Sequence, residues 1–285
     1  MRPSQEQGAT VIRLETGLDW YSATLPAGHS QSGSTYDAAM AFLEHQQAEG
    51  NTAKEATLLG YRGVLCGKCF IGERDDGILV RSTSSISTAY YEATYTPDMH
   101  VSRLDLQCTI WLTGSAVHFG RIAREAAARH RIEHPKEAKR KISAWDNEDG
   151  GYTLYIGSKA SAHFCRLYDK GAESEEEYFK GAWRYEVETH NDTATASARY
   201  ILEHSAQLEA VVAATVRQYY QSRGVTVPWY VSDEYNALRP LLALESDDAR
   251  SLKWLAAQVA PTVKRLQARG YLVSVLEALG LEQNS

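Results

Sequence analysis

The sequence has few cysteines and no long apolar run. Four cysteines, Cys66, Cys69, Cys108 and Cys165, are spread over 285 residues, which is too sparse for the disulfide framework of a small secreted domain. No stretch approaches the roughly 18 apolar residues that a membrane-spanning helix needs, and the first residues form no apolar signal segment. We therefore expect a protein of a reducing cytoplasm that has no membrane partner.

The overall charge is acidic, although one segment is basic. The formal net charge is -6 and the pI is near 5.9, which argues against indiscriminate nucleic-acid binding, because neutralising phosphates needs clustered lysine and arginine. Residues 121–141 supply such a cluster, which a solvated helix face would explain equally well. Its cations are Arg121, Arg124, Arg129, Arg131, Lys136, Lys139, Arg140 and Lys141.

Two short motifs with well-known chemistry are incomplete. The segment GYRGVLCGKC lacks the glycine that a phosphate-binding loop needs five residues before Gly67, because that position is Arg62. Cys66 and Cys69 form a C-x-x-C without the second pair that would complete a four-thiolate zinc site. A spacing of three also points side chains to opposite faces of a regular strand. We expect both cysteines to be small buried residues.

Histidines offer little to a metal ion. His130 and His134 lie one helical turn apart, but no Glu occupies the position that a metalloprotease helix requires. With Pro135 directly after them, a surface position is expected. The chain contains no His-x-His pair. A divalent cation would therefore be held largely by carboxylates, which favours Mg²⁺ or Mn²⁺ over zinc.

The first two thirds of the chain mix strand and helix patterns. An aromatic and β-branched run at 17–26 ends in proline, and residues 35–50 have helical spacing up to Gly50. A helix is predicted over 114–130, and a loop at 146–151 leads into a strand of sequence YTLYIGS. Further strands are predicted around 61–71, 77–82, 88–95 and 101–112, with an Asp-Gly turn within 73–79.

The last third has a helical pattern. Apolar residues recur at helical intervals from residue 196 to Gly224, and Ser246 is a candidate cap for a helix that Pro261 interrupts. No internal repeat is apparent. We predict an α+β protein with one domain at 1–195 and an α-helical C-terminal region at 196–285.

Polar and apolar residues alternate strictly in three of the predicted strands. In residues 101–112 the apolar set starts at Leu104, and the opposite face carries Arg103, Asp105 and Gln107. If the three strands are neighbours, one sheet face gathers a tyrosine, carboxylates and cations. The later strands add Phe164, Arg166, Tyr168, Lys170, Arg184, Glu186 and Glu188 to this face.

This set of side chains suits the attack of a phenol on a phosphodiester. Asp105 and Glu186 could hold a metal that neutralises phosphate oxygens, and Tyr168 could be the nucleophile. Lys170, Arg166 or Arg184 could stabilise the charge of the transition state. A solvent-exposed sheet face with paired charges is the alternative interpretation of the same pattern.

Five segments in order resemble the replication initiation factor family, the rolling-circle initiators of plasmids and phages, which are related to some relaxases of conjugative elements. The resemblance spans roughly residues 15–200 and continues more loosely into 252–266. The segments are DWYSAT at 19–24, SRLDLQCT at 102–109, TLYIGSKAS at 153–161, RLYDKGAE at 166–173 and WRYEVE at 183–188.

The resemblance implies an RRM-like antiparallel sheet packed with helices and a site-specific nicking endonuclease. In such enzymes a tyrosine cuts one DNA strand at the origin and stays linked to the 5′ phosphate. Carried onto this chain, the nucleophile would be Tyr168, and the ligands for Mg²⁺ or Mn²⁺ would be Asp105 and Glu186. We add Lys170 and Arg184 as catalytic residues and Glu188 as a third ligand. The domain at 1–195 would then be catalytic, and the C-terminal region would serve DNA binding or dimerisation.

The expected partners are origin DNA, a host helicase and the replication machinery of a bacterial host, and a homodimer is a further expectation. Alternatives are a conjugative relaxase of the same chemistry, a DNA-binding regulator without catalysis, and a scaffold protein. Rival nucleophiles are Tyr155, Tyr178 and the pairs Tyr90-Tyr91 and Tyr219-Tyr220. DNA contacts are predicted for Arg103, Lys159, Arg166, Arg131, Lys139 and Arg140.

Overall fold

The structure is a computed structural model, and it describes residues 10–113, 119–134, 141–146, 151–159, 161, 163–231, 235 and 260–271. The chain divides into two compact units, Met1–Leu241 and Leu242–Ser285. In the second unit the described helix is α9 (Ala260–Ala268). Pro261 lies in its first turn, where the missing N–H of proline costs no helical hydrogen bond.

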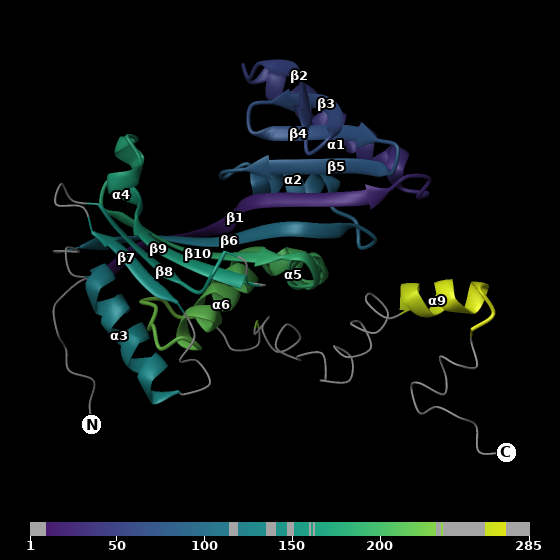
Figure 1. The fold of residues 1–285 in the computed structure, drawn as a ribbon. Helices are drawn as coiled ribbons and strands as arrows, with labels where there is room; N and C mark the ends of the chain where they lie inside the picture. Colours follow the sequence, from purple (N-terminus) through teal and green to yellow (C-terminus); the bar gives the residue numbers. More distant parts are fainter. Residues whose placement is uncertain are drawn as a thin grey trace. The chain divides into compact units, whose positions relative to one another are not determined.

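The first unit contains ten strands that form one antiparallel sheet (Figure 1). The strands are β1 (Thr10–Pro26), β2 (Ala53–Leu58), β3 (Tyr61–Cys66), β4 (Cys69–Arg74), β5 (Gly77–Thr83), β6 (His100–Thr113), β7 (Ile142–Asp146), β8 (Tyr152–Ile156), β9 (His163–Asp169) and β10 (Ala182–His190). Their order is β2-β3-β4-β5-β1-β6-β10-β9-β8-β7. The predicted α+β class, with an antiparallel-rich sheet packed with helices, is confirmed.

Helices accompany the sheet throughout this unit. The α-helices are α1 (Ser32–Ala48), α2 (Ser87–Thr94), α3 (Phe119–Glu133), α4 (Lys170–Glu173), α5 (Asn191–Glu203) and α6 (Leu208–Gln221), and the 3₁₀ turns are η3 (Glu177–Phe179) and η4 (Ser205–Gln207). None of the helices in the described ranges is long and apolar enough to cross a membrane.

The order of elements occurs twice. A long strand, β1 or β6, is followed by a helix and then by a meander of four strands whose last member pairs back onto the long strand. A helix, α2 or α5, completes each half. The two long strands pair with each other in the middle of the sheet. The structure therefore contains a topological repeat, although no internal repeat is apparent in the sequence.

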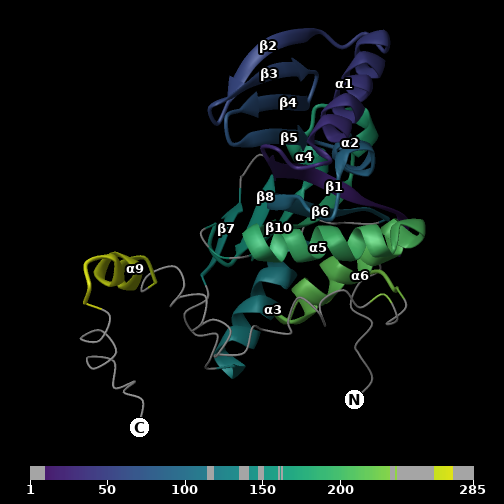
Figure 2. The same ribbon diagram turned by 90° about the vertical axis from the view of Figure 1, so that its right-hand side faces the viewer.

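Among the described helices, α1, α2, α3, α5 and α6 lie on one face of the sheet (Figures 1 and 2). Tyr91 of α2 donates a hydrogen bond to the carbonyl of Ala198 in α5 at 2.6 Å, which joins the helices of the two halves. Tyr220 of α6 donates to the carbonyl of Glu186 in β10 at 3.0 Å. Figure 2 shows α1 and α2 on one side of the strands β2 to β5, and Figure 1 shows α5 and α6 on the opposite side of the sheet from α4.

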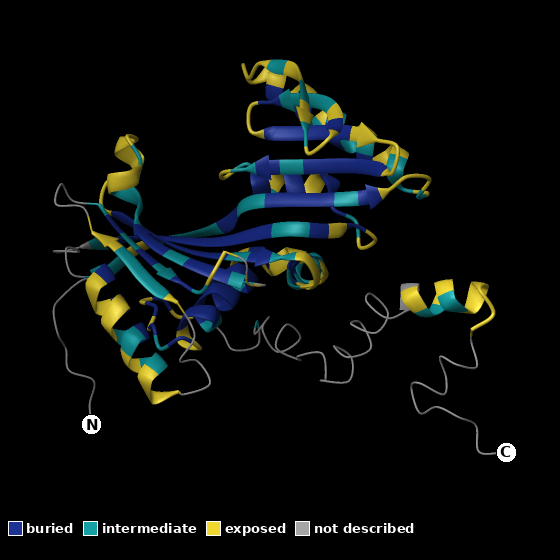
Figure 3. Cartoon of the chain, viewed as in Figure 1, coloured by how far each residue is buried: buried dark blue, intermediate teal, exposed yellow. Residues whose placement is uncertain are grey.

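The apolar residues of the alternating strands form the core against these helices. Leu104, Leu106 and Cys108 of β6 are fully buried, as are Tyr185 and Val187 of β10. Figure 3 shows that the strands in the middle of the sheet are buried along most of their length. The period of two thus separates a helix-covered apolar face from a second face that carries the polar residues.

Some element predictions were wrong. Residues 88–95 were predicted as a strand, but α2 covers them, because Ser87, Tyr90, Tyr91 and Thr94 recur at helical spacing and are its buried residues. The single strand predicted at 61–71 is the hairpin of β3 and β4. Sequence inspection did not find β2 and β7.

Cys66 and Cys69 face each other at the closed end of the β3–β4 hairpin, and both are buried free cysteines. The expectation that they are buried is confirmed. The stated reason was wrong, because the two residues belong to paired strands and not to one strand. His130 and His134 stack with ring centroids 3.9 Å apart, and His134 is exposed as expected.

Candidate active site

The polar face predicted from alternation is present. β6, β10 and β9 are neighbours in this order, and their registers place Asp105 opposite Glu188 and Tyr168 opposite Arg184. Residues paired across neighbouring antiparallel strands project from the same face. The charged side chains therefore lie together on the side of the sheet away from α5 and α6.

Tyr168 lies within this face as a buried phenol. Its hydroxyl donates a hydrogen bond to Oε1 of Glu186 at 2.5 Å. The guanidinium carbon of Arg166 lies 4.8 Å from the centre of its ring, and Nζ of Lys170 lies 5.9 Å from it. The side chain is 4% exposed, so a substrate reaches the hydroxyl only if neighbouring side chains move aside.

Glu186 is the common partner of Tyr168 and Arg166. Nε of Arg166 donates to Oε2 of Glu186 at 2.8 Å. Burial raises the pKa of the Glu186 carboxyl, and the charge of Arg166 partly opposes this rise. Burial also raises the pKa of Tyr168, as does the charge of Glu186, whereas Arg184 lowers it. The phenol is therefore protonated at neutral pH and needs a base to accept its proton.

Arg184 connects this group to β1. Its Nη1 donates to Oδ1 of Asp19 at 2.9 Å, and its Nε donates to the hydroxyl of Thr109 at 2.8 Å. Asp19 was missed as a site residue, although it stands in the DWYSAT segment that carried the family resemblance. A carboxylate at the start of that segment was the available signal.

Asp105 and Glu188 share one arginine. Nε and Nη2 of Arg103 donate to the two oxygens of Asp105 at 2.9 and 2.6 Å, and Nη2 also donates to Glu188 at 2.8 Å. Nε2 of His190 lies 2.8 Å from the other oxygen of Glu188. Burial raises the pKa of Asp105 to about 7, because Arg103 only partly offsets it and Glu188 and Glu186 add repulsion.

The carboxylates of the polar face are the type of ligand that a hard divalent cation prefers. Asp105 and Glu188 pair across β6 and β10, and Glu186 lies two positions along β10 on the same face. Oxygen donors of this type suit Mg²⁺ or Mn²⁺. A cation would relieve the repulsion from Glu188 and Glu186 that adds to the effect of burial on the pKa of Asp105. In the described ranges no three His, Cys, Asp or Glu side chains already form a metal cluster. A cation would have to displace Arg103, which now bridges two of the carboxylates.

The segment between β9 and β10 folds over the tyrosine end of the face. Lys170 does not continue β9 as predicted, because Asp169 ends the strand and accepts a hydrogen bond from the backbone N–H of Ala172 at 2.9 Å, which caps α4. Nζ of Lys170 pairs with Glu173 at 2.5 Å. The ring of Phe179 lies 5.5 Å from the guanidinium carbon of Arg184.

The predicted DNA-binding residues are distributed over both sides of the sheet. Arg103 and Arg166 belong to the polar face, and Lys159 is exposed in the turn after β8. Arg131 lies on α3, which packs on the helix-covered side, where Gly120 closely approaches Tyr152. Lys139, Arg140 and Ser246 lie outside the described residues.

The rival tyrosines also separate between the two sides. Tyr90 and Tyr91 are buried in α2, and Tyr219 and Tyr220 are buried in α6, all on the helix-covered side. Tyr155 of β8 stacks on Phe164 at 5.7 Å on the polar face. Tyr178 is 47% exposed, and its hydroxyl donates a hydrogen bond to Glu15. Tyr155 and Tyr178 are thus the rivals that share the face of Tyr168.

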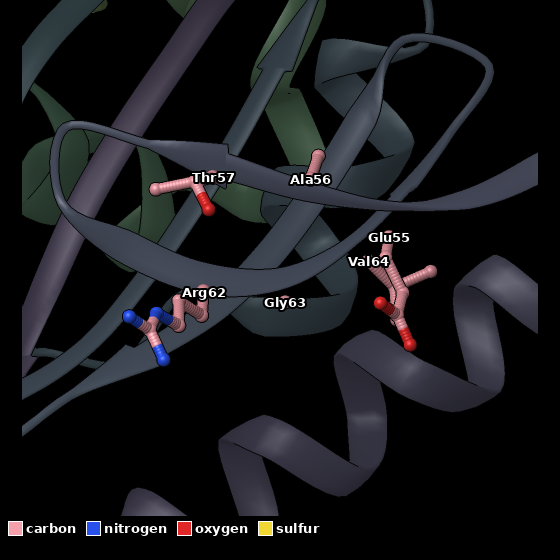
Figure 4. A pocket seen from close by; sticks show the side chains of 6 residues that line it. All are labelled: Glu55, Ala56, Thr57, Arg62, Gly63 and Val64. Carbon is pink, nitrogen blue, oxygen red and sulfur yellow. The ribbon is translucent and has the colours of Figure 1, made fainter.

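A hollow in the first half of the sheet lies apart from these groups. It has a volume of about 530 Å³ and lies along the β2–β3 hairpin (Figure 4). None of the charged residues described above lines it. The lining residues are Glu55, Ala56, Thr57, Arg62, Gly63 and Val64.

Comparison with known proteins agrees with the family resemblance. The family model described as replication initiation factor matches residues 99–275, which is more than half of the chain, and this chain belongs to that family. Among solved structures, a rolling circle replication initiator protein from Geobacillus stearothermophilus is similar with 16% sequence identity and a TM-score of 0.45, covering 71% of this chain and 83% of that chain. No curated protein matches the chain.

Proposed function

We propose that this chain initiates rolling-circle replication by nicking one strand of origin DNA with Tyr168. The observation that carries the proposal is the hydrogen bond from the Tyr168 hydroxyl to Glu186, on a face where Arg166 and Arg184 lie beside the same phenol. The pair supplies a nucleophile and a base in contact, and the arginines supply positive charge for a phosphate.

The proposed chemistry is a transesterification. The Tyr168 oxygen attacks the phosphorus while its proton passes to Glu186, which is a suitable base because burial raises the pKa of its carboxyl. The bond from phosphorus to the 3′ oxygen breaks, and that oxygen leaves as a hydroxyl after taking a proton from solvent or from Lys170. The products are a 5′-phosphotyrosyl link and a free 3′ end, which primes synthesis.

The charges around the scissile phosphate have separate roles. Arg166 and Arg184 lie over or beside the phenol and would bind the non-bridging oxygens as charge develops on them. Asp105 and Glu188 would hold Mg²⁺ or Mn²⁺, since the oxygens of Glu186 are engaged by Tyr168 and Arg166 and this carboxylate has to accept the proton. A cation bound there would neutralise phosphate oxygens and assist the leaving oxygen.

The proposal includes the protein's setting. The substrate is origin DNA in a bacterial cytoplasm. A host helicase would unwind the duplex, and the host replication machinery would extend the free 3′ end. The region after residue 195 would aid DNA binding or dimerisation. Most of α5 and all of α6 belong to that region, and they pack on β6 and β10 on the side of the sheet opposite the site.

The test is incubation of the purified chain with supercoiled plasmid from its own genetic element, with Mg²⁺ or Mn²⁺, followed by a denaturing gel. A relaxed circle with a strand linked to protein is expected. Plasmids carrying either the replication origin or a transfer origin distinguish an initiator from a conjugative relaxase. Binding without nicking on both plasmids would support a DNA-binding regulator, and no binding would support a scaffold.

A further inference from the structure

Of the arginines that project from the polar face, four lie on β5, β6, β10 and β9, and three of these four are paired with carboxylates. Arg103 contacts Asp105 and Glu188, Arg166 contacts Glu186, and Arg184 contacts Asp19. The fourth is Arg81 of β5. Within the residues that the structure describes, its guanidinium makes neither a hydrogen bond nor an ion pair, so its donors are available.

Arg81 is nevertheless held in place by an aromatic ring. Its guanidinium carbon lies 4.3 Å from the ring centre of Trp20, and that of Arg103 lies 4.1 Å from the same ring. β5 and β6 flank β1 on opposite sides, so the indole receives one guanidinium from each neighbouring strand. Stacking engages the flat face of a guanidinium and leaves its N–H donors, which lie in the plane, free to bind a further group.

The surroundings of Arg81 favour an anion. The side chain is half-buried, and both burial and the charge of Arg103 lower its pKa. Each effect disfavours the charged form of the Arg81 guanidinium. The group nevertheless stays charged, because arginine loses its proton only far above neutral pH. An anion in the plane of the guanidinium would offset both effects. A stacked arginine with free donors is a typical phosphate ligand, because its fork matches two phosphate oxygens.

The position of Arg81 relates it to the nicking site. Trp20 is paired with Asp105 across β1 and β6, and β5 is separated from β9 by three strands. At about 4.8 Å for each strand interval, Arg81 lies about 19 Å across the sheet from the strand of Tyr168. The registers also displace it along the strands by about 20 Å, because Tyr168 aligns with Thr109 of β6 and Arg81 aligns with Arg103 of β6. A DNA strand with its scissile phosphate at Tyr168 would reach Arg81 a few nucleotides away.

We propose that Arg81, oriented by Trp20, binds a backbone phosphate of the DNA strand to one side of the nicked position. The inference rests on the proposed function, because it takes the face of Tyr168 as the DNA-binding face. Arg81 and Trp20 precede residue 99, where the match to the family begins. The first half of the sheet thus contributes a DNA contact that does not depend on base sequence, because it is made to a phosphate.

The test measures the affinity of full-length Tyr168→Phe protein for a fluorescent oligo(dT) strand by anisotropy over a series of KCl concentrations. Adding Arg81→Gln should weaken binding about tenfold at low salt and reduce the slope of log affinity against log salt by about 0.7. Arg81→Lys should keep the slope and lose affinity, because it keeps the charge without the fork. Trp20→Leu should also keep the slope, and it should lose less affinity than Arg81→Lys.

The matched control is Arg62→Gln, which removes the same charge from an exposed position of β3. Equal slopes and affinities for the Arg81→Gln and Arg62→Gln proteins would overturn the proposal, as would a slope that falls with Arg81→Lys. If the unfolding temperature shows that the Arg81→Gln protein does not fold, the Arg81→Lys and Trp20→Leu proteins test the proposal through their affinities and salt slopes. Nicking by the wild type is scored separately, so that a failure of Arg81 as a ligand and a failure of the nicking chemistry are distinguishable.

Discussion

On the face away from the helices, the second half of the sheet carries Asp105, Glu186 and Tyr168, whereas the first half carries Tyr61, Phe70 and Leu79, which pack on one another. The two halves repeat the same order of elements around β1 and β6. A common framework therefore supports an ionic face in one half and an apolar face in the other. The chemistry depends on a few side chains and not on the framework.

The comparison also shows where the halves depend on each other. The family match covers the second half and the helices behind it, yet Arg184 takes a carboxylate partner, Asp19, from β1. Trp20 on the same strand stacks on Arg103. The long strand β1 of the first half thus completes the charge network of the second, and β5 beside it places Arg81 against the same ring of Trp20.

Replacing the proposed nucleophile should have the largest effect. The Tyr168→Phe change keeps the ring and its packing but removes the hydroxyl, so nicking of supercoiled plasmid should fall about a thousandfold or more. The matched control is Tyr178→Phe, which removes the exposed hydroxyl on the same face and should leave nicking close to wild type. Nicking that survives Tyr168→Phe and disappears with Tyr178→Phe would reverse the assignment.

The proposed base should have the next largest effect. Glu186→Gln keeps the shape of the side chain and a carbonyl acceptor for Tyr168 but removes the basic carboxylate, so single-turnover nicking at neutral pH should slow about a hundredfold. Glu73→Gln, at an exposed position of β4 in the first half, is the control and should not slow nicking. Equal rates for the two variants would remove Glu186 from the mechanism.

Binding of Mn²⁺ should depend on the ionisation of Asp105. Because the pKa of this carboxyl is raised to about 7, it is largely protonated below that pH, and a cation must displace the proton. Affinity measured by calorimetry should therefore fall as the pH drops below about 7, by up to tenfold per pH unit. Asp105→Asn should abolish this dependence. An affinity that is constant from about pH 5.5 to 8.5 would contradict the ligand assignment.

A core substitution in the first half should have the smallest effect on nicking. Leu79 is 1% exposed in the Tyr61 and Phe70 cluster, so Leu79→Ala should lower the free energy of unfolding by about 2–5 kcal/mol, measured by urea denaturation. The nicking rate of the folded variant should remain that of the wild type. A variant that stays folded and loses nicking would show that this half takes part in the chemistry.

Alternation predicted the polar face because each of its strands buries one side against helices. Residues 101–112 and 182–188 therefore showed a period of two in sequence, and the structure makes their strands neighbours. β2 and β7 were not predicted. They are the two edge strands, with mostly exposed or half-buried side chains, so burial imposes little alternation on their sequences.

The partners of the site residues could not be predicted from sequence. The pairing of Arg184 with Asp19 and the stacking of Arg81 on Trp20 join residues that are far apart in the chain, and they depend on a strand order that alternation does not determine. The strand predicted at 88–95 failed for a related reason. Its aromatic residues favour strands in general, but Tyr90 and Tyr91 pack as the buried side of a helix.

The most direct test of the account identifies the tyrosine that becomes linked to DNA. Wild-type protein is incubated with its origin DNA and Mn²⁺, the adduct is digested with nuclease and trypsin, and the modified peptide is sequenced by mass spectrometry. Cleavage after Arg166 and Lys170 separates Tyr168 from Tyr178 and from Tyr155. The account predicts a nucleotide on the Leu167–Lys170 peptide, and a nucleotide on any other tyrosine would contradict it.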